Sequence, residues 1–398
     1  MTADNALDVD VLIIGGGIAG LWTLAKLRRE GYSAVLLESD ALGAGQTRYA
    51  QGIIHGGTKY ALTGKLTASS EAVADMPAHW RACHAGEGEL DISDAKKLSD
   101  AHYLWSTTTL TSRISGFFAS KVMRSRTASL QDAARPALFS HPDFRGQIYQ
   151  LDEPVYDTLS VLLALAEPMM DHILEIDASS VEAGKDSLAV KDKQGASYTF
   201  NYQQLVLMAG SGNRDCLAQL GYAQPEMQLR PLKMVMLRGE LHERVFAHCL
   251  GASVNPRVTI TSHSDENNNI VWYLGGQLAE DGVKRSNAEQ ISQTQKDLAE
   301  LIPWLSLSNS EWGVLDIDRA EVRKPGGARP DTFYASQQDR VITAWPTKLA
   351  LAPVLAEHVL QLVAGSGIKH TGGGQLPTWP RATIATFPWC EPHRWGVH

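Results

Sequence analysis

Three glycines and one carboxylate near the N-terminus have the spacing of a dinucleotide-binding turn. Gly15, Gly17 and Gly20 follow an apolar run of strand length, and a second such run ends in Glu38. In such a turn the first glycine permits a sharp bend, the second admits a pyrophosphate close to the backbone, and the third lets the next helix pack tightly on the strand. The helix N-terminus attracts the phosphates, and the carboxylate accepts hydrogen bonds from the ribose hydroxyl groups.

The surrounding residues predict a complete βαβ unit over residues 11–38. An apolar run, the glycines, a helical pattern and a second apolar run follow in register. Leu21, Leu24 and Leu27 recur at helical spacing on the face that turns toward the sheet. The alternative is a glycine-rich turn in a protein that binds no nucleotide. If a nucleotide does bind, an acid rather than a base at the end of the second strand disfavours NADP, because an acid repels its 2′-phosphate. The turn adds two predicted cofactor contacts, Ile18 and Ala19.

Beyond this unit the chain resembles the FAD-dependent oxidoreductases of the D-amino-acid oxidase superfamily. Within it, the sequence is most similar to the flavin-linked glycerol-3-phosphate dehydrogenases and L-2-hydroxyglutarate oxidases. The likeness is carried by GAGQTRYAQGIIHGGTKYAL (43–62), QQLVLMAGSGN (203–213) and GGARPDTFYASQQDRVITAWPTKLALAPVLAE (326–357). The resemblance implies FAD as cofactor and hydride transfer from the substrate to flavin N5. A separate NAD site is not expected, because Asp215 stands where a third glycine would be needed.

His55 is the first predicted catalytic residue. It follows Gly52 and precedes Gly56 and Gly57, so the backbone there can come close to a flavin. An imidazole is suited to act as general base near neutral pH, which an alcohol substrate requires. A histidine that only packs against the flavin is the alternative. Some members of the superfamily attach the flavin to a nearby histidine, but the tryptophan that precedes it in those members is absent, so we expect non-covalent FAD.

Lys348 is the second predicted catalytic residue. The sequence predicts a helix that begins at Pro346, with Lys348 in its first turn and a kink at Pro353. The ammonium group and the positive helix end would stabilise negative charge at flavin N1 and the C2 carbonyl. The resemblance implies a similar lysine after glycines, although other residues precede Lys348 here, and a solvated surface lysine is the alternative.

Arg329 is the third predicted catalytic residue. It resembles the family's arginine that meets the anionic group of the substrate, and a guanidinium can grip a carboxylate or phosphate with two hydrogen bonds. The alternative is a salt bridge to Asp331 or another acid. Six further residues are possible site residues that could equally be loop or core residues: Arg48, Tyr60, Arg230, His263, Arg323 and Lys324. The remaining predicted cofactor contacts are Gln46, Thr47, Ala209, Gly210, Thr347, Lys348 and Leu349.

The pattern predicts an α/β fold with two domains. A Rossmann-type, glutathione-reductase-like FAD-binding domain is expected to be discontinuous, and a second α+β substrate domain is expected to be built on an antiparallel sheet, with strands in 229–239 and 256–276. The tail, rich in Gly, Pro and Trp, is expected to be an extended strap docked on the surface. The expected limits are 1–75, 152–222 and 335–371 for the FAD-binding domain, 76–151 and 223–334 for the substrate domain, and 372–398 for the tail.

Composition narrows the class of protein. The 398 residues carry a net charge of -8, so there is no basic excess to bind nucleic acid. The four cysteines are far apart, which predicts neither disulfides nor a metal site. The N-terminus has no signal peptide pattern, which predicts a cytoplasmic protein. The stretch SGFFASKVMRSR (115–126) keeps peripheral membrane contact open, although a surface segment is favoured.

Three functions are consistent with the sequence. The leading hypothesis is an enzyme that oxidises a small anionic secondary alcohol, of the glycerol phosphate or 2-hydroxy acid type. The second is an amine or amino-acid oxidase on the same scaffold, which needs no strong base. The third is a flavin-binding partner subunit, or a membrane-docked component, without its own catalysis. The electron acceptor is left open as oxygen, a quinone or a partner protein.

Overall fold

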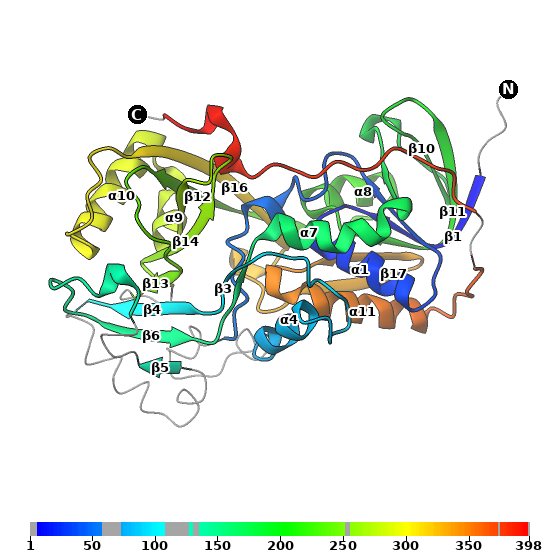
Figure 1. The fold of residues 1–398 in the computed structure, drawn as a ribbon. Coiled ribbons are helices and arrows are strands. Elements are labelled where there is room, and N and C mark those ends of the chain that lie inside the picture. Colours follow the sequence, from blue (N-terminus) through cyan, green and yellow to red (C-terminus); the bar gives the residue numbers. More distant parts are fainter. Residues whose placement is uncertain are drawn as a thin grey trace.

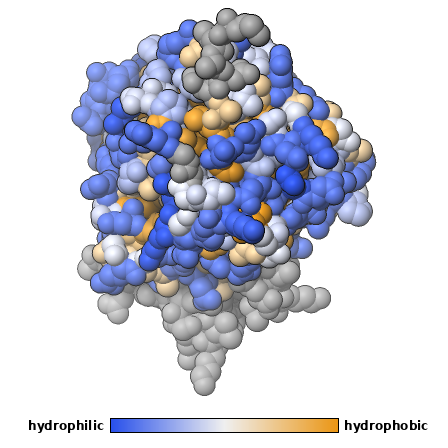
Figure 2. Space-filling view, turned by 90° about the vertical axis from the view of Figure 1, so that its right-hand side faces the viewer, coloured by the Kyte–Doolittle hydropathy of each residue, from blue (hydrophilic) through white to orange (hydrophobic). Residues whose placement is uncertain are grey.

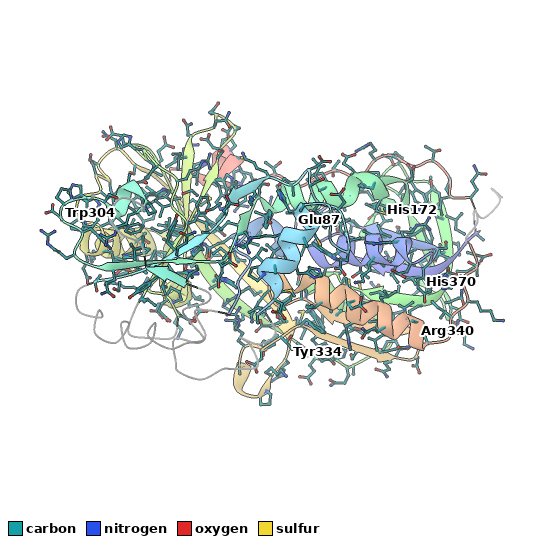
Figure 3. All side chains as sticks on the ribbon, turned by 60° about the horizontal axis from the view of Figure 1, so that its bottom comes forward. Glu87, His172, Trp304, Tyr334, Arg340 and His370 are labelled. Carbon is teal, nitrogen blue, oxygen red and sulfur yellow. The ribbon has the colours of Figure 1, made fainter. Side chains whose placement is uncertain are left out.

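The chain forms two large sheets that lie side by side (Figure 1). The computed structural model describes residues 6–57, 73–107, 127–129, 135–250, 255–372 and 375–396. Figure 3 places Trp304 at the far end of the part built on the second sheet, and Arg340 and His370 at the opposite end, beside the first sheet. The observed α/β architecture agrees with the predicted fold class.

The first sheet has a parallel centre, as the βαβ pattern predicts. The order is β17-β18-β11-β1-β2-β8, in which only β17 pairs antiparallel, and β10 and β9 extend β11 as an antiparallel insertion. The strands are β1 (Ala6–Ile14), β2 (Ala34–Glu38), β8 (Ile173–Glu175), β9 (Glu182–Ala183), β10 (Ser187–Lys191), β11 (Ser197–Leu207), β17 (Tyr334–Gln338) and β18 (Val341–Trp345).

Helices cover one face of this sheet, and the antiparallel insertion, one short helix and part of the tail cover the other. The helices are α1 (Ile18–Arg29), α4 (Met76–His84), α7 (Thr158–Ala166), α8 (Asn213–Gln219) and α11 (Ala352–Gly365). The predicted leucines of α1 are fully buried, and so is Trp22 on the other side of the helix. The reason is that α7 and α11 pack against α1, so that it is buried all round rather than amphipathic.

The second sheet is antiparallel except at one pair. Its order is β16-β12-β15-β14-β13-β4-β6-β5, and only β13 with β4 is parallel. Strands β12, β14 and β15 fall where the sequence predicts them. The strands are β4 (His102–Ser106), β5 (Thr127–Ser129), β6 (Gln147–Leu151), β12 (Met227–Arg238), β13 (Ala247–Cys249), β14 (Val258–Ser264), β15 (Ile270–Gly275) and β16 (Glu311–Val322).

The two faces of the second sheet have different partners. One face is covered by α9 (Gln277–Asp281) and α10 (Asn287–Leu301), the latter begun by a capping box of Ser286 and Glu289. The opposite face carries Met234, Met236 and Tyr273 and is crossed by the chain that follows the short 3-10 helix η1 (Gln46–Tyr49). This face is therefore turned toward the segment that holds the predicted contacts Gln46 and Thr47.

Helix α4 contacts the first sheet's helical layer. Trp80 is fully buried and donates its indole N–H to the carbonyl of Ala350 at 3.1 Å. Nearby, β3 (Lys97–Ser99) pairs with β7 (Val155–Tyr156) in a two-stranded sheet. The predicted domain boundary at residue 76 therefore assigns α4 to a different domain from the helices on which it packs. The domain limits as a whole stay a prediction.

The C-terminal tail crosses from the first sheet to the second (Figure 1, red). Trp379 packs on Tyr198 and Phe200 of β11 in the first sheet. Further along, Trp389 is fully buried against the second sheet and stacks on His263 at 4.1 Å between ring centroids. The prediction of a strap was right, but its last part belongs to a hydrophobic core rather than to the surface.

The segment before α11 differs from the prediction. The helix begins at Ala352, with Pro353 in its first turn, and Leu349–Leu351 form a separate 3-10 turn. The predicted start at Pro346 was wrong, and so was the predicted kink at Pro353. Pro353 lacks an N–H, which costs nothing in the first turn of a helix, so it marks the start of α11.

None of the helices in the described ranges is both long and apolar enough to cross a membrane. The molecular face at the β10–β11 end is largely hydrophilic, with hydrophobic atoms in patches among the polar ones (Figure 2). The basic stretch 115–126 lies outside the described residues, so membrane contact through it stays a prediction.

The buried His263 predicts a pH dependence of stability. Burial lowers the pKa of His263 to about 3. In the unfolded chain His263 takes up a proton near the ordinary histidine pKa of about 6.5, whereas in the folded chain it stays neutral. The free energy of unfolding therefore falls as the pH drops below about 6.5, by up to about 1.4 kcal/mol per pH unit. His263→Phe keeps a ring against Trp389 and removes the proton. Urea unfolding between about pH 6 and about pH 4 should show a shallower decline for this variant; equal slopes would contradict the assignment.

Candidate cofactor and active site

The glycines of the turn are required by close contacts. Gly15 has a φ of +114°, and a Cβ there would lie 2.5 Å from the carbonyl oxygen of Met208, which directly follows β11. A Cβ on Gly20 would lie 1.9 Å from the carbonyl oxygen of Gly15. These contacts hold the start of α1 against the end of β1, as the sequence predicts.

The N-terminus of α1 is open on the side of the turn. Gly17 is its N-cap, and no side chain caps it from that position. Thr47 reaches it from η1, because its Oγ1 accepts the N–H of Ile18 at 3.1 Å. The other N–H groups of the first turn keep the positive end of the helix, which suits a pyrophosphate. Thr47 and Ile18 thus meet at the predicted phosphate site, and Ala19 follows in the same turn.

Glu38 lies directly beside this turn. Its Oε2 accepts the N–H of Gly16 at 2.5 Å, and its Oε1 accepts those of Ser39 and Asp40 at 2.8 and 2.9 Å. Three backbone donors therefore fix the carboxylate at the carboxyl end of β2. A carboxylate in this position can hold a ribose, and that role stays a prediction for Glu38.

The second group of predicted contacts lies across the same edge of the sheet. Gln46 Oε1 accepts the N–H of Ala320 on β16 at 3.2 Å. A Cβ on Gly210 would lie 3.4 Å from Gln46 Nε2, and the Gly210 carbonyl accepts the indole N–H of Trp345 at 2.9 Å. The structure thus brings together Gln46 and Gly210, with Ala209 next to Gly210. The N-terminus of α1, the crowded glycines and Glu38 fit an FAD nucleotide.

His55 has a buried carboxylate as its partner. Its Nδ1 lies 3.0 Å from Oε2 of Glu153, whose side chain is only 1% exposed. Glu153 Oε1 accepts the N–H of Gly56 at 2.9 Å. Burial raises the pKa of the Glu153 carboxyl, but the hydrogen bond and charge of His55 outweigh it, so the pKa is lowered overall. Sequence reasoning missed Glu153, because only the fold brings it 98 positions back to His55.

Two histidines of the second sheet adjoin this pair. His248 on β13 stacks on His55 with 5.7 Å between ring centroids, and its Nδ1 lies 2.8 Å from Oγ1 of Thr259. The ring centroid of His102 on β4 lies 4.1 Å from that of His248. Ligand atoms of His55, Glu153 and His248 lie within 4.8 Å of one another. Such a spacing suits a metal site as well as a hydrogen-bonded cluster, and the one contact of known length, His55 Nδ1 to Glu153 Oε2 at 3.0 Å, is that of a hydrogen bond.

Lys348 lies beside the loop that carries Arg329. Lys348 Nζ donates to the carbonyl of Asp331 at 3.1 Å, and Thr347 Oγ1 donates to that of Thr332 at 3.0 Å. Thr347 has a φ of +57°, a strained value for a residue with a branched side chain. Lys348 is buried, which argues against a solvated surface lysine. Leu349 follows as the first residue of the 3-10 turn.

Arg329 is one of three neighbouring arginines. Its Nε is buried without a hydrogen-bond partner, and within the described chain it forms no ion pair with Asp331. Arg230 and Arg319 are cross-strand partners on β12 and β16, and Arg319 Nε donates to the Arg230 carbonyl at 3.2 Å. Burial, with the positive charges of Arg230 and Arg329, lowers the pKa of Arg319 to about 10. Arg319 was not predicted, because only strand pairing places it beside Arg230.

Two carboxylates balance part of this positive charge. Glu321 accepts from Arg230 Nε at 2.9 Å. Glu280 of α9 lies 3.5 Å from Arg230 and 3.6 Å from Arg319. Three guanidinium groups therefore face two carboxylates, and the excess positive charge suits an anion.

The other possible site residues have structural partners or lie elsewhere. Arg48 pairs with Glu391 of the tail at 2.7 Å, and His263 is buried under Trp389. Arg323 is two-thirds exposed and pairs with Glu226 at 2.7 Å. Lys324 is exposed, with its N–H bound to Gln228. Tyr60 lies outside the described residues.

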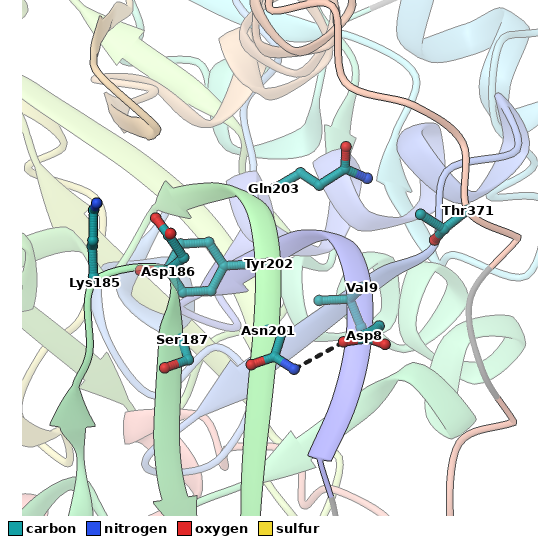
Figure 4. A pocket seen from close by; sticks show the side chains of 9 residues that line it. All are labelled: Asp8, Val9, Lys185, Asp186, Ser187, Asn201, Tyr202, Gln203 and Thr371. Carbon is teal, nitrogen blue, oxygen red and sulfur yellow. Dashed lines mark hydrogen bonds between the residues drawn. The ribbon is translucent and has the colours of Figure 1, made fainter.

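A surface groove lies away from all of these residues. It is a wide opening along the ends of β1, β10 and β11, where Asn201 donates to Asp8 at 2.8 Å (Figure 4). None of the predicted site residues lines it. The residues that line it are Asp8, Val9, Lys185, Asp186, Ser187, Asn201, Tyr202, Gln203 and Thr371.

The close contact at Gly20 predicts a loss of cofactor. Gly20→Ala would force α1 away from the Gly15 carbonyl, at a cost of about 1–3 kcal/mol or more, and displace the phosphate site. We expect the purified variant to lose most of its flavin absorbance and to unfold at a lower temperature. Gly365→Ala is the matched control, because its Cβ would meet no atom within 4 Å at the end of α11. Flavin retained in full by Gly20→Ala would contradict the packing argument.

Comparison with known proteins identifies the family of this chain. The sequence profile of the FAD dependent oxidoreductase family, DAO, matches residues 10–361. A Pseudomonas aeruginosa protein described as a probable FAD-dependent oxidoreductase is 44% identical over 386 residues, which are 97% of this chain and 98% of that protein. Its crystal structure superposes with a TM-score of 0.84 at 40% identity, covering 96% of this chain and 98% of that one.

Two more distant structures share the fold. Glycine oxidase from Geobacillus kaustophilus has a TM-score of 0.63 at 15% identity, over 90% of this chain and 95% of that one. The L-alpha-glycerophosphate oxidase from Mycoplasma pneumoniae, with FAD bound, has a TM-score of 0.63 at 12% identity, over 96% and 99%. At these identities the likeness concerns the fold alone. The extent of the profile match and the 44% identical relative show that this chain belongs to the DAO family of FAD-dependent oxidoreductases.

Proposed function

We propose that this enzyme oxidises a small anionic secondary alcohol, of the glycerol phosphate or 2-hydroxy acid type. The observation that carries the proposal is the pair of His55 and the buried Glu153. An alcohol must lose its hydroxyl proton as its C–H bond breaks, whereas an amine need only be neutral beforehand. A histidine held by a buried carboxylate is suited to take that proton.

The arginines support an anionic substrate. Among the described residues the buried Nε of Arg329 has no hydrogen-bond partner, and the charges of Arg230 and Arg319 lie beside it. A guanidinium binds carboxylate and phosphate through paired hydrogen bonds, so an acid group of the substrate would complete this cluster. Lys348, tied to the Arg329 loop, would add positive charge near the flavin.

Roles in binding FAD are proposed for the predicted cofactor contacts as well. We propose that Gly15, Gly17 and Gly20 admit the pyrophosphate and that Glu38 holds the ribose. When bound, FAD supplies the acceptor for the substrate's two electrons. We propose that it is held without a covalent bond, that the enzyme acts in the cytoplasm, and that oxygen, a quinone or a partner protein takes the electrons onward. The further contacts proposed are Ile18, Ala19, Gln46, Thr47, Ala209, Gly210, Thr347, Lys348 and Leu349.

Amine or amino-acid oxidation is the second candidate function. The same arginines would hold the carboxylate of an amino acid, and the fold is also that of a glycine oxidase. The His55–Glu153 pair favours the alcohol, because an amine has no use for so strong a base.

Replacing His55 separates the two substrate classes. His55→Gln should lower kcat on the alcohol that bleaches the flavin by about 10²–10⁴-fold, and should change turnover of an amine little. The measurement is anaerobic flavin reduction by glycerol 3-phosphate, L-2-hydroxyglutarate, other hydroxy acids and amino acids in turn. An amino acid that alone reduces the flavin, with equal rates in wild type and His55→Gln, would overturn the proposal.

Replacing Arg329 tests the anionic group. Arg329→Lys keeps the charge but loses the two-pronged grip, so KM for the anionic substrate should rise about tenfold or more while flavin content stays unchanged. Arg323→Lys is the matched control, since this exposed arginine pairs only with Glu226 among the described residues. An equal KM in Arg329→Lys and wild type would exclude Arg329 from substrate binding.

A further inference from the structure

Glu153 is a carboxylate that the fold buries at a cost. It follows β6 and precedes β7, and its side chain is 1% exposed. A buried charge costs several kcal/mol unless hydrogen bonds and an opposite charge compensate it. The Gly56 N–H and the Nδ1 of His55 provide that compensation at 2.9 and 3.0 Å.

The donors around Glu153 decide where the proton of His55 lies. A backbone N–H can only donate, so Oε1 of Glu153 is an acceptor toward Gly56. The lowered pKa of the Glu153 carboxyl keeps it ionised near neutral pH, so Oε2 has no proton to give. The hydrogen bond at 3.0 Å then requires the proton on His55 Nδ1. The second ring nitrogen, Nε2, is left as the basic atom of the neutral ring.

We propose that Glu153 is a positioning residue that holds His55 in the tautomer with a basic Nε2. The proposal rests on the proposed role of His55 as base. As the reaction proceeds, the substrate O–H bond breaks and an N–H bond forms at Nε2. Glu153 keeps its charge throughout and stabilises the imidazolium that results.

The other titratable groups at this place come from the second sheet. His248 stacks on His55, and its Nδ1 is engaged with Thr259. His102 lies against His248, and a positive charge on His102 would lower the pKa of Glu153 further. A second positive charge here would compete for the same carboxylate. Glu153 therefore acts on His55 through a direct hydrogen bond. His248 lies next to the His55 ring, and His102 lies next to His248.

Glu153→Gln is expected to invert the tautomer. The Gly56 N–H needs an acceptor, so the amide oxygen of the glutamine turns to it and the amide NH₂ turns to His55 Nδ1. Nδ1 must then accept, which moves the proton of the neutral ring to Nε2. We expect kcat on the alcohol to fall by about 10²–10⁴-fold at neutral pH with little change in KM. Glu153→Asp keeps the charge and should restore part of the loss.

The tautomer can be read without turnover. Long-range ¹H–¹⁵N spectra of ¹⁵N-histidine holoenzyme, with His55 assigned from His55→Gln, should show the proton on Nδ1 in wild type and on Nε2 in Glu153→Gln. Asp265→Asn is the matched control, because Asp265 is also a buried carboxylate but pairs with Arg238 and Asn269. It should leave the His55 signals unchanged.

The outcomes separate this inference from the proposed function. A proton on Nε2 in wild type, or an unchanged tautomer in Glu153→Gln, overturns the role of Glu153. A stoichiometric metal ion in the holoenzyme that is lost on replacing Glu153 overturns it as well, because Nδ1 would then be a ligand. An inverted tautomer with undiminished alcohol turnover upholds the hydrogen bond and overturns the base, and with it the proposed function. An inverted tautomer with lost turnover supports both.

Discussion

The close approach of α1 to the end of β1 is the constraint on which the rest of the structure depends. The carbonyl of Gly15 lies where a side chain at position 20 would begin. This contact sets the helix N-terminus directly over the sheet edge, where Glu38 and Thr47 converge. Helices α7 and α11 pack on α1. The positions of these helices therefore also depend on the close contact between Gly15 and Gly20.

The second sheet owes its place to contacts that are remote in sequence. Its inner face packs against the chain after η1, where the phenol of Tyr273 donates to the carbonyl of Tyr49 at 3.1 Å. The tail adds a second connection, since Trp379 packs on one sheet and Trp389 on the other. A fully buried indole stabilises a fold by several kcal/mol, so the tail is part of what holds the two sheets together.

The charged groups of the candidate site form two clusters of opposite character. On one side Glu153, buried and ionised, holds an imidazole; on the other, three arginines exceed the carboxylates around them. One arrangement suits removal of a proton and the other suits retention of an anion. Neither arises from neighbours in sequence: the first joins two loops 98 positions apart, and the second joins cross-strand partners to a loop.

The sequence by itself determined the class of fold and predicted the nucleotide site. Gly15, Gly17, Gly20 and Glu38 lie within one βαβ unit, where backbone geometry is local and glycine has few substitutes. Local pattern misplaced the start of α11, because a proline early in a helical run also suits the first turn of a helix that begins later. Only tertiary structure decided that Glu153 meets His55, that Arg319 lies beside Arg230 and that Trp389 is buried. Each of these depends on which distant segments pack together, and burial and charge pairing are properties of that packing rather than of any spacing along the chain.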